Sequence, residues 1–130
     1  MKNTALNRRE SEKLTISIFF GMGLSLMLEN IFKANLVKDI KKMFPGCIVF
    51  KNEGWQGAPD ILILYYDRWA ALETKRSRGA AKRPNQEYYV ELLDEMSFAA
   101  FIYPENKWEV LDDLERAFTS RRRTRIPQRQ

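Results

Sequence analysis

The chain contains no histidine, and this absence excludes several kinds of active site. Ser-His-Asp and Cys-His hydrolysis, general-base catalysis by histidine and most catalytic zinc sites all require an imidazole ring. The single cysteine, Cys47, cannot form an internal disulfide or a cysteine-rich zinc site, and we expect it to be a small buried residue of a core strand. Chemistry in this chain must therefore come from carboxylates, lysines, hydroxyls or a hard metal ion.

The chain also lacks an apolar run long enough to span a membrane. The uncharged, mostly apolar stretch 14–28 has fifteen residues, whereas a membrane-spanning helix needs about 20. Two arginines precede it as in a signal peptide, but no small-x-small cleavage site follows. We expect residues 1–28 to be an N-terminal extension, polar and flexible over 1–13, with an apolar helix or strand over 14–28 that packs on the domain. Alternatively the natural chain starts at Met27, or the apolar stretch docks on a membrane or a partner helix in an interaction protein.

Positive charge is concentrated in two segments of an otherwise neutral chain. The 130 residues suffice for one domain, and 45% hydrophobic with 30% charged residues can bury a core. The net charge of +5 equals the five arginines of residues 117–130, so the first 116 residues are formally neutral. A second basic run over 76–83 carries Arg76, Arg78, Lys82 and Arg83. Such segments indicate a polyanionic partner, with a solubilising tail and a solvated loop as the alternative.

Apolar periodicity and turn residues predict one α/β domain over residues 29–118, followed by a basic tail over 119–130. The predicted order is helix, three strands, helix, strand, helix, a small α/β sandwich. Pro45-Gly46 ends the first helix, Pro84 begins the second, which runs to about Met96, and Asn106 caps the third. Strands are predicted at 47–51, 61–66, 69–74 and 97–103, the second being apolar throughout and hence central. The apolar residues expected on the helices are Ile31, Phe32, Leu36, Ile40, Met43, Phe44, Tyr88, Leu92, Leu93, Met96, Trp108, Val110, Leu111, Leu114 and Phe118.

The predicted hairpin brings charged residues together at one end of the sheet. If Asp67-Arg68 is a two-residue turn, Asp60 lies opposite Lys75, and Glu73 is the diagonal neighbour of Asp60. Two carboxylates and an ammonium then share one face of an otherwise apolar hairpin. Such a cluster is costly to bury unless it has a function, although a turn aspartate and a surface ion pair would be the simpler interpretation.

Two facing carboxylates without histidine suit Mg²⁺ or Mn²⁺, which are hard cations that take oxygen ligands. The backbone carbonyl of Thr74 could supply a further oxygen. Lys75 would help to position or deprotonate an attacking water and stabilise charge on a phosphate. Gly54 and Gly57 would let the backbone approach a ligand closely. The arrangement suits metal-assisted phosphodiester hydrolysis.

These residues carry a resemblance to a known family. Gly57-Ala58-Pro59-Asp60, followed by Glu73-Thr74-Lys75 and then Gln86, resembles the PD-(D/E)xK nuclease superfamily, and more narrowly the small phage and bacterial members of the VRR-NUC family. The resemblance covers roughly residues 29–118. It implies a restriction-endonuclease-like αβββαβ core, with a small mixed sheet flanked by helices, and a Mg²⁺-dependent (or Mn²⁺-dependent) endodeoxyribonuclease.

The resemblance also implies roles for individual residues. Asp60 and Glu73 match the metal-binding acids, Lys75 the catalytic lysine, and Gln86 the glutamine near the active site. Glu29 in the first helix matches an additional metal-binding acid, although Asp39 lies on the same helix. The position three before Gln86, often serine in the family, is Arg83 here, which puts the hydrogen bonding at the helix start in doubt.

The partner implied by the resemblance is DNA, with selectivity for branched or Holliday-junction structure rather than sequence, and a homodimer is then expected. It further implies a cytoplasmic protein, in the host cytoplasm if the gene is of phage origin. Arg76, Arg78, Lys82 and Arg83, with the C-terminal arginines, are expected to contact phosphates. Trp55 could stack on a base, but we expect it to fold back onto the core. The alternative function is a catalytically inactive nucleic-acid-binding module on the same scaffold.

Overall fold

The computed structural model describes the backbone of residues 2–120 and the side chains of Gly21 and residues 23–120. The elements are α1 (Lys2–Met43), β1 (Ile48–Lys51), β2 (Ile61–Tyr65), β3 (Arg68–Thr74), α2 (Pro84–Met96), β4 (Phe98–Ile102) and α3 (Lys107–Thr119). The predicted order of helices and strands is confirmed, and with it the α/β class. All five arginines of the predicted basic tail lie outside the described residues.

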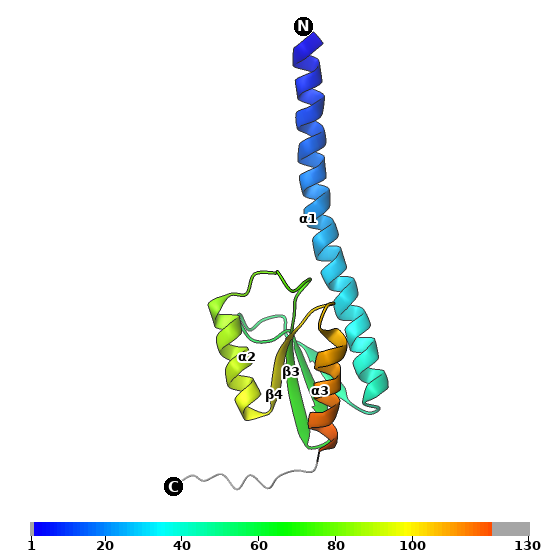
Figure 1. Ribbon diagram of the computed structural model, residues 1–130, viewed down its shortest axis with the longest axis vertical. Helices are drawn as coiled ribbons and strands as arrows, with labels where there is room; N and C mark the ends of the chain where they lie inside the picture. Colours follow the sequence, from blue (N-terminus) through cyan, green and yellow to red (C-terminus); the bar gives the residue numbers. More distant parts are fainter. Residues whose placement is uncertain (1, 121–130) are drawn as a thin grey trace.

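The four strands form one open mixed sheet in the order β1-β2-β3-β4. β1, β2 and β3 pair antiparallel, whereas β4 lies parallel to β3 because α2 crosses over between them. Helices α1 and α3 pack on one face of the sheet, and α2 packs on the other (Figure 1). The expected central position of the second strand is confirmed, since β2 has a neighbour on each side.

Most of the core lies between the sheet and the helix pair α1 and α3. The residues of this cluster that are fully buried are Leu36, Ile40, Ile61, Ile63, Ala70, Leu72, Ile102, Leu111 and Leu114. The smaller cluster beneath α2 consists of Ala71, Val90 and Ala99. Since α2 covers only β3 and β4, Ile48, Phe50 and Leu62 on β1 and β2 remain 54%, 54% and 37% exposed.

The predicted turn of the β2–β3 hairpin was wrong by one residue. Tyr65 pairs with Arg68, so Tyr66 and Asp67 form the connection, and Arg68 belongs to β3. The guanidinium of Arg68 donates to the backbone carbonyls of Ala117 and Ser120 at the end of α3, which holds Arg68 in the strand. Tyr66 takes a left-handed φ of 56°, at a cost of roughly 1–2 kcal/mol for a residue with a Cβ.

This turn changes which charged residues face each other. In the observed register Ile61 pairs with Leu72 and Leu62 with Ala71, so the next pair along the hairpin is Asp60 with Glu73. The expected pairing of Asp60 with Lys75, and of Glu73 with Leu62, was therefore wrong. The shift is by an even number of residues, so the buried and exposed faces of each strand are retained.

Helix α1 differs from the expectation for the N-terminal segment. Its backbone continues from Lys2 to Met43 without a break and projects beyond the sheet, so the boundary expected at residue 28 lies within a helix (Figure 1). The segment has no proline, and its two glycines each cost only about 1 kcal/mol in a helix. Within the described side chains of the apolar stretch, Leu24, Leu26 and Leu28 are exposed, so these apolar side chains do not pack on the domain as expected. None of the described helices is long and apolar enough to cross a membrane.

Some residues expected in the core lie on the surface. Ile31, Tyr88, Met96 and Trp108 are 49% to 61% exposed, because the helices cover a sheet of only four strands and their flanks extend past it. Val37 and Val90 are buried in their place. Cys47, expected to be a buried residue of a core strand, instead precedes β1 and is only half-buried against the core; this partial burial raises the pKa of its thiol.

Candidate active site

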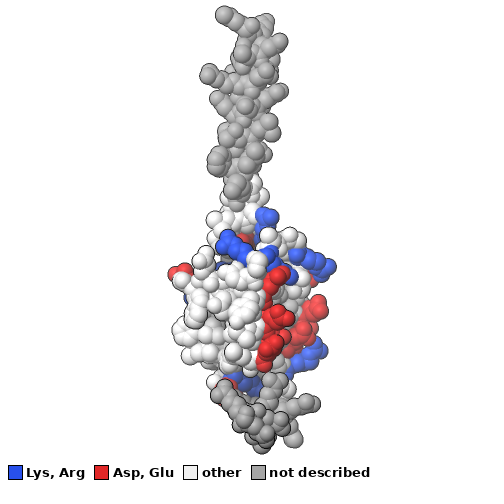
Figure 2. Space-filling view, turned by 90° about the vertical axis from the view of Figure 1, so that its left-hand side faces the viewer, with Lys and Arg blue, Asp and Glu red and all other residues white. Residues whose placement is uncertain are grey.

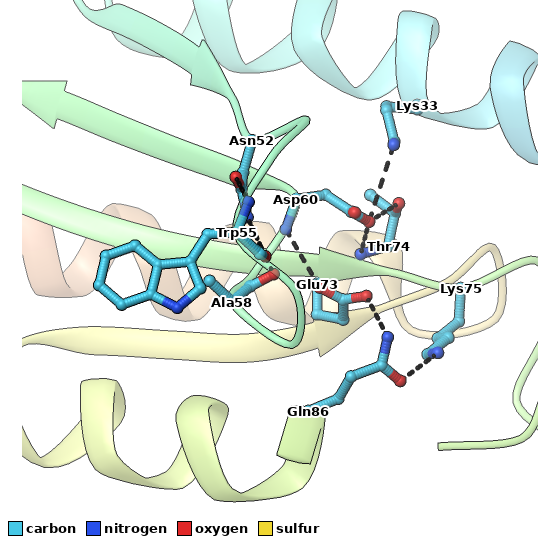
Figure 3. Close-up of polar contacts among 9 residues, drawn as sticks. All are labelled: Lys33, Asn52, Trp55, Ala58, Asp60, Glu73, Thr74, Lys75 and Gln86. Carbon is cyan, nitrogen blue, oxygen red and sulfur yellow. Dashed lines mark hydrogen bonds and ion pairs between the residues drawn. The ribbon is translucent and has the colours of Figure 1, made fainter. Parts of the chain in front are cut away.

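Asp60 and Glu73 meet where β2 begins and β3 ends. The backbone N–H of Asp60 donates to Glu73 Oε2 at 3.1 Å. Thr74 in turn holds the Asp60 carboxylate, because its backbone N–H and its hydroxyl both donate to Asp60 Oδ2, at 3.1 and 2.6 Å (Figure 3). Only the carbonyl oxygen of Thr74 was expected to take part in the site; in the structure its two donor groups fix the orientation of the Asp60 carboxylate.

Glu73 is a buried acid beside another acid. Its side chain projects from β3, and the residue is only 4% exposed. The pKa of Glu73 is raised from 4.5 to about 7, first by burial of the carboxyl group and second by the negative charge of Asp60. Lys75, the N–H of Asp60 and Lys33 act in the opposite direction but do not cancel the effect. The surrounding protein groups therefore stabilise the ionised form of Glu73 only incompletely.

Gln86 connects Glu73 with Lys75. Its Nε2 donates to Glu73 Oε1 at 3.0 Å, and its Oε1 accepts from Lys75 Nζ at 2.7 Å (Figure 3). The same Oε1 accepts the backbone N–H of Arg83 at 3.1 Å, which is the N-cap position of α2. The Arg83 side chain makes no capping hydrogen bond, but Gln86 accepts the free backbone N–H at the start of α2. The three hydrogen bonds of Gln86 together fix its side-chain amide between Glu73 and Lys75.

Lys33 is a residue of the site that the sequence analysis missed. From α1 its Nζ lies 3.7 Å from Asp60 Oδ2, with 27% of its side chain exposed. In the sequence it is one of several lysines of the first helix that are expected to lie away from its apolar face. The signal that could have identified it is its spacing of four residues from Glu29, which places both on one helix face.

Glu29 does not complete a group of three acids in this structure. Among the residues with described side chains, no three of the Asp, Glu and Cys type come together as a metal-binding group. The site therefore consists of Asp60 and Glu73, with Lys33 rather than Glu29 as the α1 residue in contact. Asp39, the alternative acid, pairs with Lys107 Nζ at 2.5 Å and belongs to the contact of α1 with α3.

The loop between β1 and β2 leads into the site and is organised by Asn52. The backbone N–H of Asn52 donates to the Asp60 carbonyl at 2.7 Å. Its side-chain Oδ1 accepts the N–H of Trp55 at 3.0 Å, and its Nδ2 donates to the Trp55 carbonyl at 2.9 Å. Gly57 has a φ of +89°, and a Cβ there would lie 2.6 Å from Asn85 Nδ2 in the first turn of α2. The sequence predicted that Gly57 lets the backbone approach a ligand; in the structure the glycine lets the backbone approach Asn85 of α2.

The expectation that Trp55 folds back onto the core was wrong. Its indole is 68% exposed, and its ring contact is an edge-on approach to Tyr89 of α2, with centroids 6.4 Å apart. A loop held down by Asn52 at one side and by Gly57 against α2 at the other leaves the tryptophan outside the core.

Residues 76–83, here called the basic loop, follow Lys75 and lead into α2, and contacts hold this loop at three points. Arg76 donates to the Ser25 hydroxyl of α1, the N–H of Arg78 donates to Glu105, and Lys82 Nζ lies 4.5 Å from the centroid of the Phe101 ring. Figure 2 shows lysines and arginines gathered at the end of the domain where α1 leaves it, with acidic side chains below them. The side chains of Arg78 and Arg83 are exposed and available to a ligand.

Comparison with known proteins adds nothing to these observations, because no family model, no curated protein and no solved structure matches the chain. The function must therefore be inferred from the chemistry of the site itself.

Proposed function

We propose that this chain is a metal-dependent endonuclease that hydrolyses DNA phosphodiester bonds, in the manner of the VRR-NUC nucleases that its sequence resembles. The observation that carries the proposal is the contact of Asp60 with Glu73, together with the Gln86 amide that joins Glu73 to Lys75. Two acids and a lysine are thereby assembled at one end of a sheet, beside a basic loop.

The two carboxylates suit a hard divalent cation. The raised pKa of Glu73 reflects repulsion from Asp60 as well as burial, and a cation between the two acids would relieve both. Asp60 and Glu73 would hold Mg²⁺ or Mn²⁺, with waters and backbone oxygens, such as the Thr74 carbonyl, as the remaining ligands. When bound, the ion would neutralise the negative charge that develops on a phosphate during hydrolysis.

The remaining residues have distinct tasks in this reaction. The oxygen of a water forms a bond to phosphorus, the bond from phosphorus to one sugar oxygen breaks, and the proton lost by the water passes to solvent while the leaving oxygen is protonated from it. Lys75, held by Gln86, orients that water and donates a hydrogen bond to the phosphate. Thr74 fixes the Asp60 carboxylate, and Lys33 offers a second cation for the phosphate from the α1 side.

The basic loop supplies the grip on the DNA backbone. Arg78 and Arg83 are exposed in the segment that joins Lys75 to α2, and phosphate contacts of this kind position a substrate without reading its bases. Because these contacts do not read bases, we expect the protein to select a DNA structure, such as a flap or a four-way junction, and not a DNA sequence. Cutting both strands of a junction symmetrically would require a second copy of the chain.

The alternative is a nucleic-acid-binding module without turnover. The complete set of Asp60, Glu73 and Lys75 argues against it, since a degenerate site would be expected to have lost a member. Cleavage of labelled linear, flapped and four-way-junction DNA in Mg²⁺, in Mn²⁺ and in EDTA separates the two functions. Cutting only with a metal ion supports the nuclease. Binding that weakens steeply with salt, without cutting of any of the three DNAs, would favour the module.

A further inference from the structure

Trp55 presents an exposed aromatic surface beside the acid pair. The indole is 68% exposed, although a tryptophan gains more than almost any other side chain from burial. Figure 3 shows it on the same loop that leads into Asp60, with the ring directed away from the carboxylates. The tryptophan is thus next to the proposed site of cleavage without occupying it.

The loop holds the backbone of Trp55 in a defined place. Asn52 bonds to both the N–H and the carbonyl of Trp55, and its own backbone N–H bonds to the carbonyl of Asp60. One asparagine therefore ties the tryptophan and the metal-binding acid to each other. Because this backbone is ordered before a ligand arrives, the loop loses little conformational entropy on binding.

The contact between Trp55 and Tyr89 leaves ring surface open. The two rings meet at an interplanar angle of 74°, so Tyr89 supports the indole edge-to-face and does not stack flat upon it. Tyr88, 61% exposed, extends the aromatic surface along α2, where its ring lies 5.3 Å from that of Tyr89. A flat, neutral ligand could stack on this surface.

We propose that Trp55 is a stacking site for an unpaired nucleobase of the DNA substrate, an inference that rests on the proposed function. The acid pair and the exposed arginines of the basic loop require a phosphodiester nearby, and a nucleotide joined to that phosphodiester carries a base within reach. Bases inside a duplex are already paired and stacked on their neighbours, so an unpaired base is the one that can lie on the indole. The substrate class is therefore DNA with a single-stranded segment next to the scissile bond.

A second copy of the chain is the competing occupant of this region. Ile48, Phe50 and Leu62 form an uncovered apolar face on β1 and β2, and a dimer that buried this face could also cover Trp55. Charge favours the nucleobase, because Asn52 connects Trp55 to Asp60, and the Nζ of Lys33 lies 3.7 Å from the carboxylate of Asp60. The oligomeric mass of the variants distinguishes the two occupants.

The test is the affinity of wild type, Trp55→Ala and Trp55→Phe for labelled DNA, measured by fluorescence anisotropy in EDTA. The ligands are a blunt duplex of two separate, fully paired strands and the same duplex with a single-stranded overhang. Trp108→Ala is the matched control, since Trp108 is 60% exposed but lies on α3. We expect Trp55→Ala to weaken overhang binding by about tenfold to a hundredfold, with little effect on the blunt duplex, while Trp55→Phe retains most of it and Trp108→Ala matches wild type.

The inference is overturned if Trp55→Ala binds the overhang as wild type does, if it weakens both DNAs equally, or if it changes the mass of the free protein in light scattering. Cleavage assayed separately in Mg²⁺ tells the two proposals apart. A Trp55-dependent preference for the overhang without any cleavage would sustain the stacking site and reject the nuclease. Cleavage that is indifferent to Trp55 would do the reverse.

Discussion

Asp60 and Glu73, thirteen residues apart, are joined by a hydrogen bond from the backbone N–H of Asp60 to Glu73 Oε2 at 3.1 Å. Each acid also has its own support, Thr74 and Lys33 for Asp60 and Gln86 for Glu73. The supports come from β3, α1 and α2, so three elements of the fold converge on one pair of carboxylates. A surface ion pair would not need such support.

The raised pKa of Glu73 predicts that the metal-free protein loses stability as pH rises. The folded protein holds a proton on Glu73 up to a pKa of about 7, whereas the unfolded chain releases it near 4.5. Between these values the folded state binds more protons, so the free energy of unfolding falls with increasing pH, by up to roughly 3 kcal/mol, and is constant above pH 8. Urea denaturation in EDTA at pH 5, 6, 7 and 8 measures this slope.

Glu73→Gln is the control for that slope, because glutamine does not titrate. The variant loses one acceptor and has a different absolute stability, but its free energy of unfolding should change little between pH 5 and 8. The chain has no histidine to titrate in the same range. A wild-type stability that is constant or rises over this range would show that Glu73 is ionised at an ordinary pKa.

Gln86→Met should reduce cleavage more than it reduces stability. Methionine fills similar space but cannot join Glu73 to Lys75, so Lys75 loses its orientation, and we expect single-turnover cleavage to slow by about tenfold to a hundredfold. The lost bond to the Arg83 N–H should cost about 1 kcal/mol in urea denaturation. Wild-type cleavage by Gln86→Met would remove the glutamine from the site.

Gly57→Ala should destabilise the loop that leads to Asp60. The added Cβ would meet Asn85 at 2.6 Å, and alanine disfavours a φ of +89°, so the free energy of unfolding should fall by about 1–3 kcal/mol. Gly54→Ala in the same loop is the matched control, because its Cβ would meet nothing within 4 Å. Equal stabilities of the two variants would contradict the close packing of Gly57 on α2.

Arg78→Gln and Arg83→Gln should weaken DNA binding in a salt-dependent manner. Each phosphate contact that is lost lowers the slope of log K against log salt concentration by about 1, without changing the order of preference among DNA sequences. Fluorescence anisotropy at NaCl concentrations from about 50 to about 200 mM gives this slope. The same substitution at Arg116, an exposed residue of α3 that pairs with Asp113, is the comparison. An unchanged slope in both loop variants would exclude the loop as the phosphate contact.

Much of the fold could be predicted from the sequence because strong local signals coincide with its element ends. Pro45-Gly46 ends α1, Pro84 begins α2 and the apolar run 61–66 marks the central strand. The hairpin turn could not be predicted, since Tyr66 adopts a left-handed conformation that tyrosine rarely takes. What favours this turn is the distant contact of Arg68 with the end of α3, which no local pattern reveals.

The site was only partly predictable for a similar reason. Motif spacing identified Asp60, Glu73, Lys75 and Gln86, which the structure brings together. Lys33 could not be identified, because the sequence shows a lysine on a helix but not which sheet end the helix passes. The exposure of Trp55 depends on Asn52 and on the packing of Gly57 against α2, and both are properties of the folded loop.

The most direct test of the nuclease is the Mg²⁺-dependent cleavage of labelled four-way-junction and overhang DNA by wild type, Glu73→Ala and Glu91→Ala. Glu91 is an exposed acid of α2 outside the site and controls for the loss of one negative charge. We expect wild type and Glu91→Ala to cut at similar rates, EDTA to abolish cutting, and Glu73→Ala to cut at least about a hundredfold more slowly. Cutting by Glu73→Ala at the wild-type rate would contradict the assignment of Asp60 and Glu73 as the catalytic acid pair.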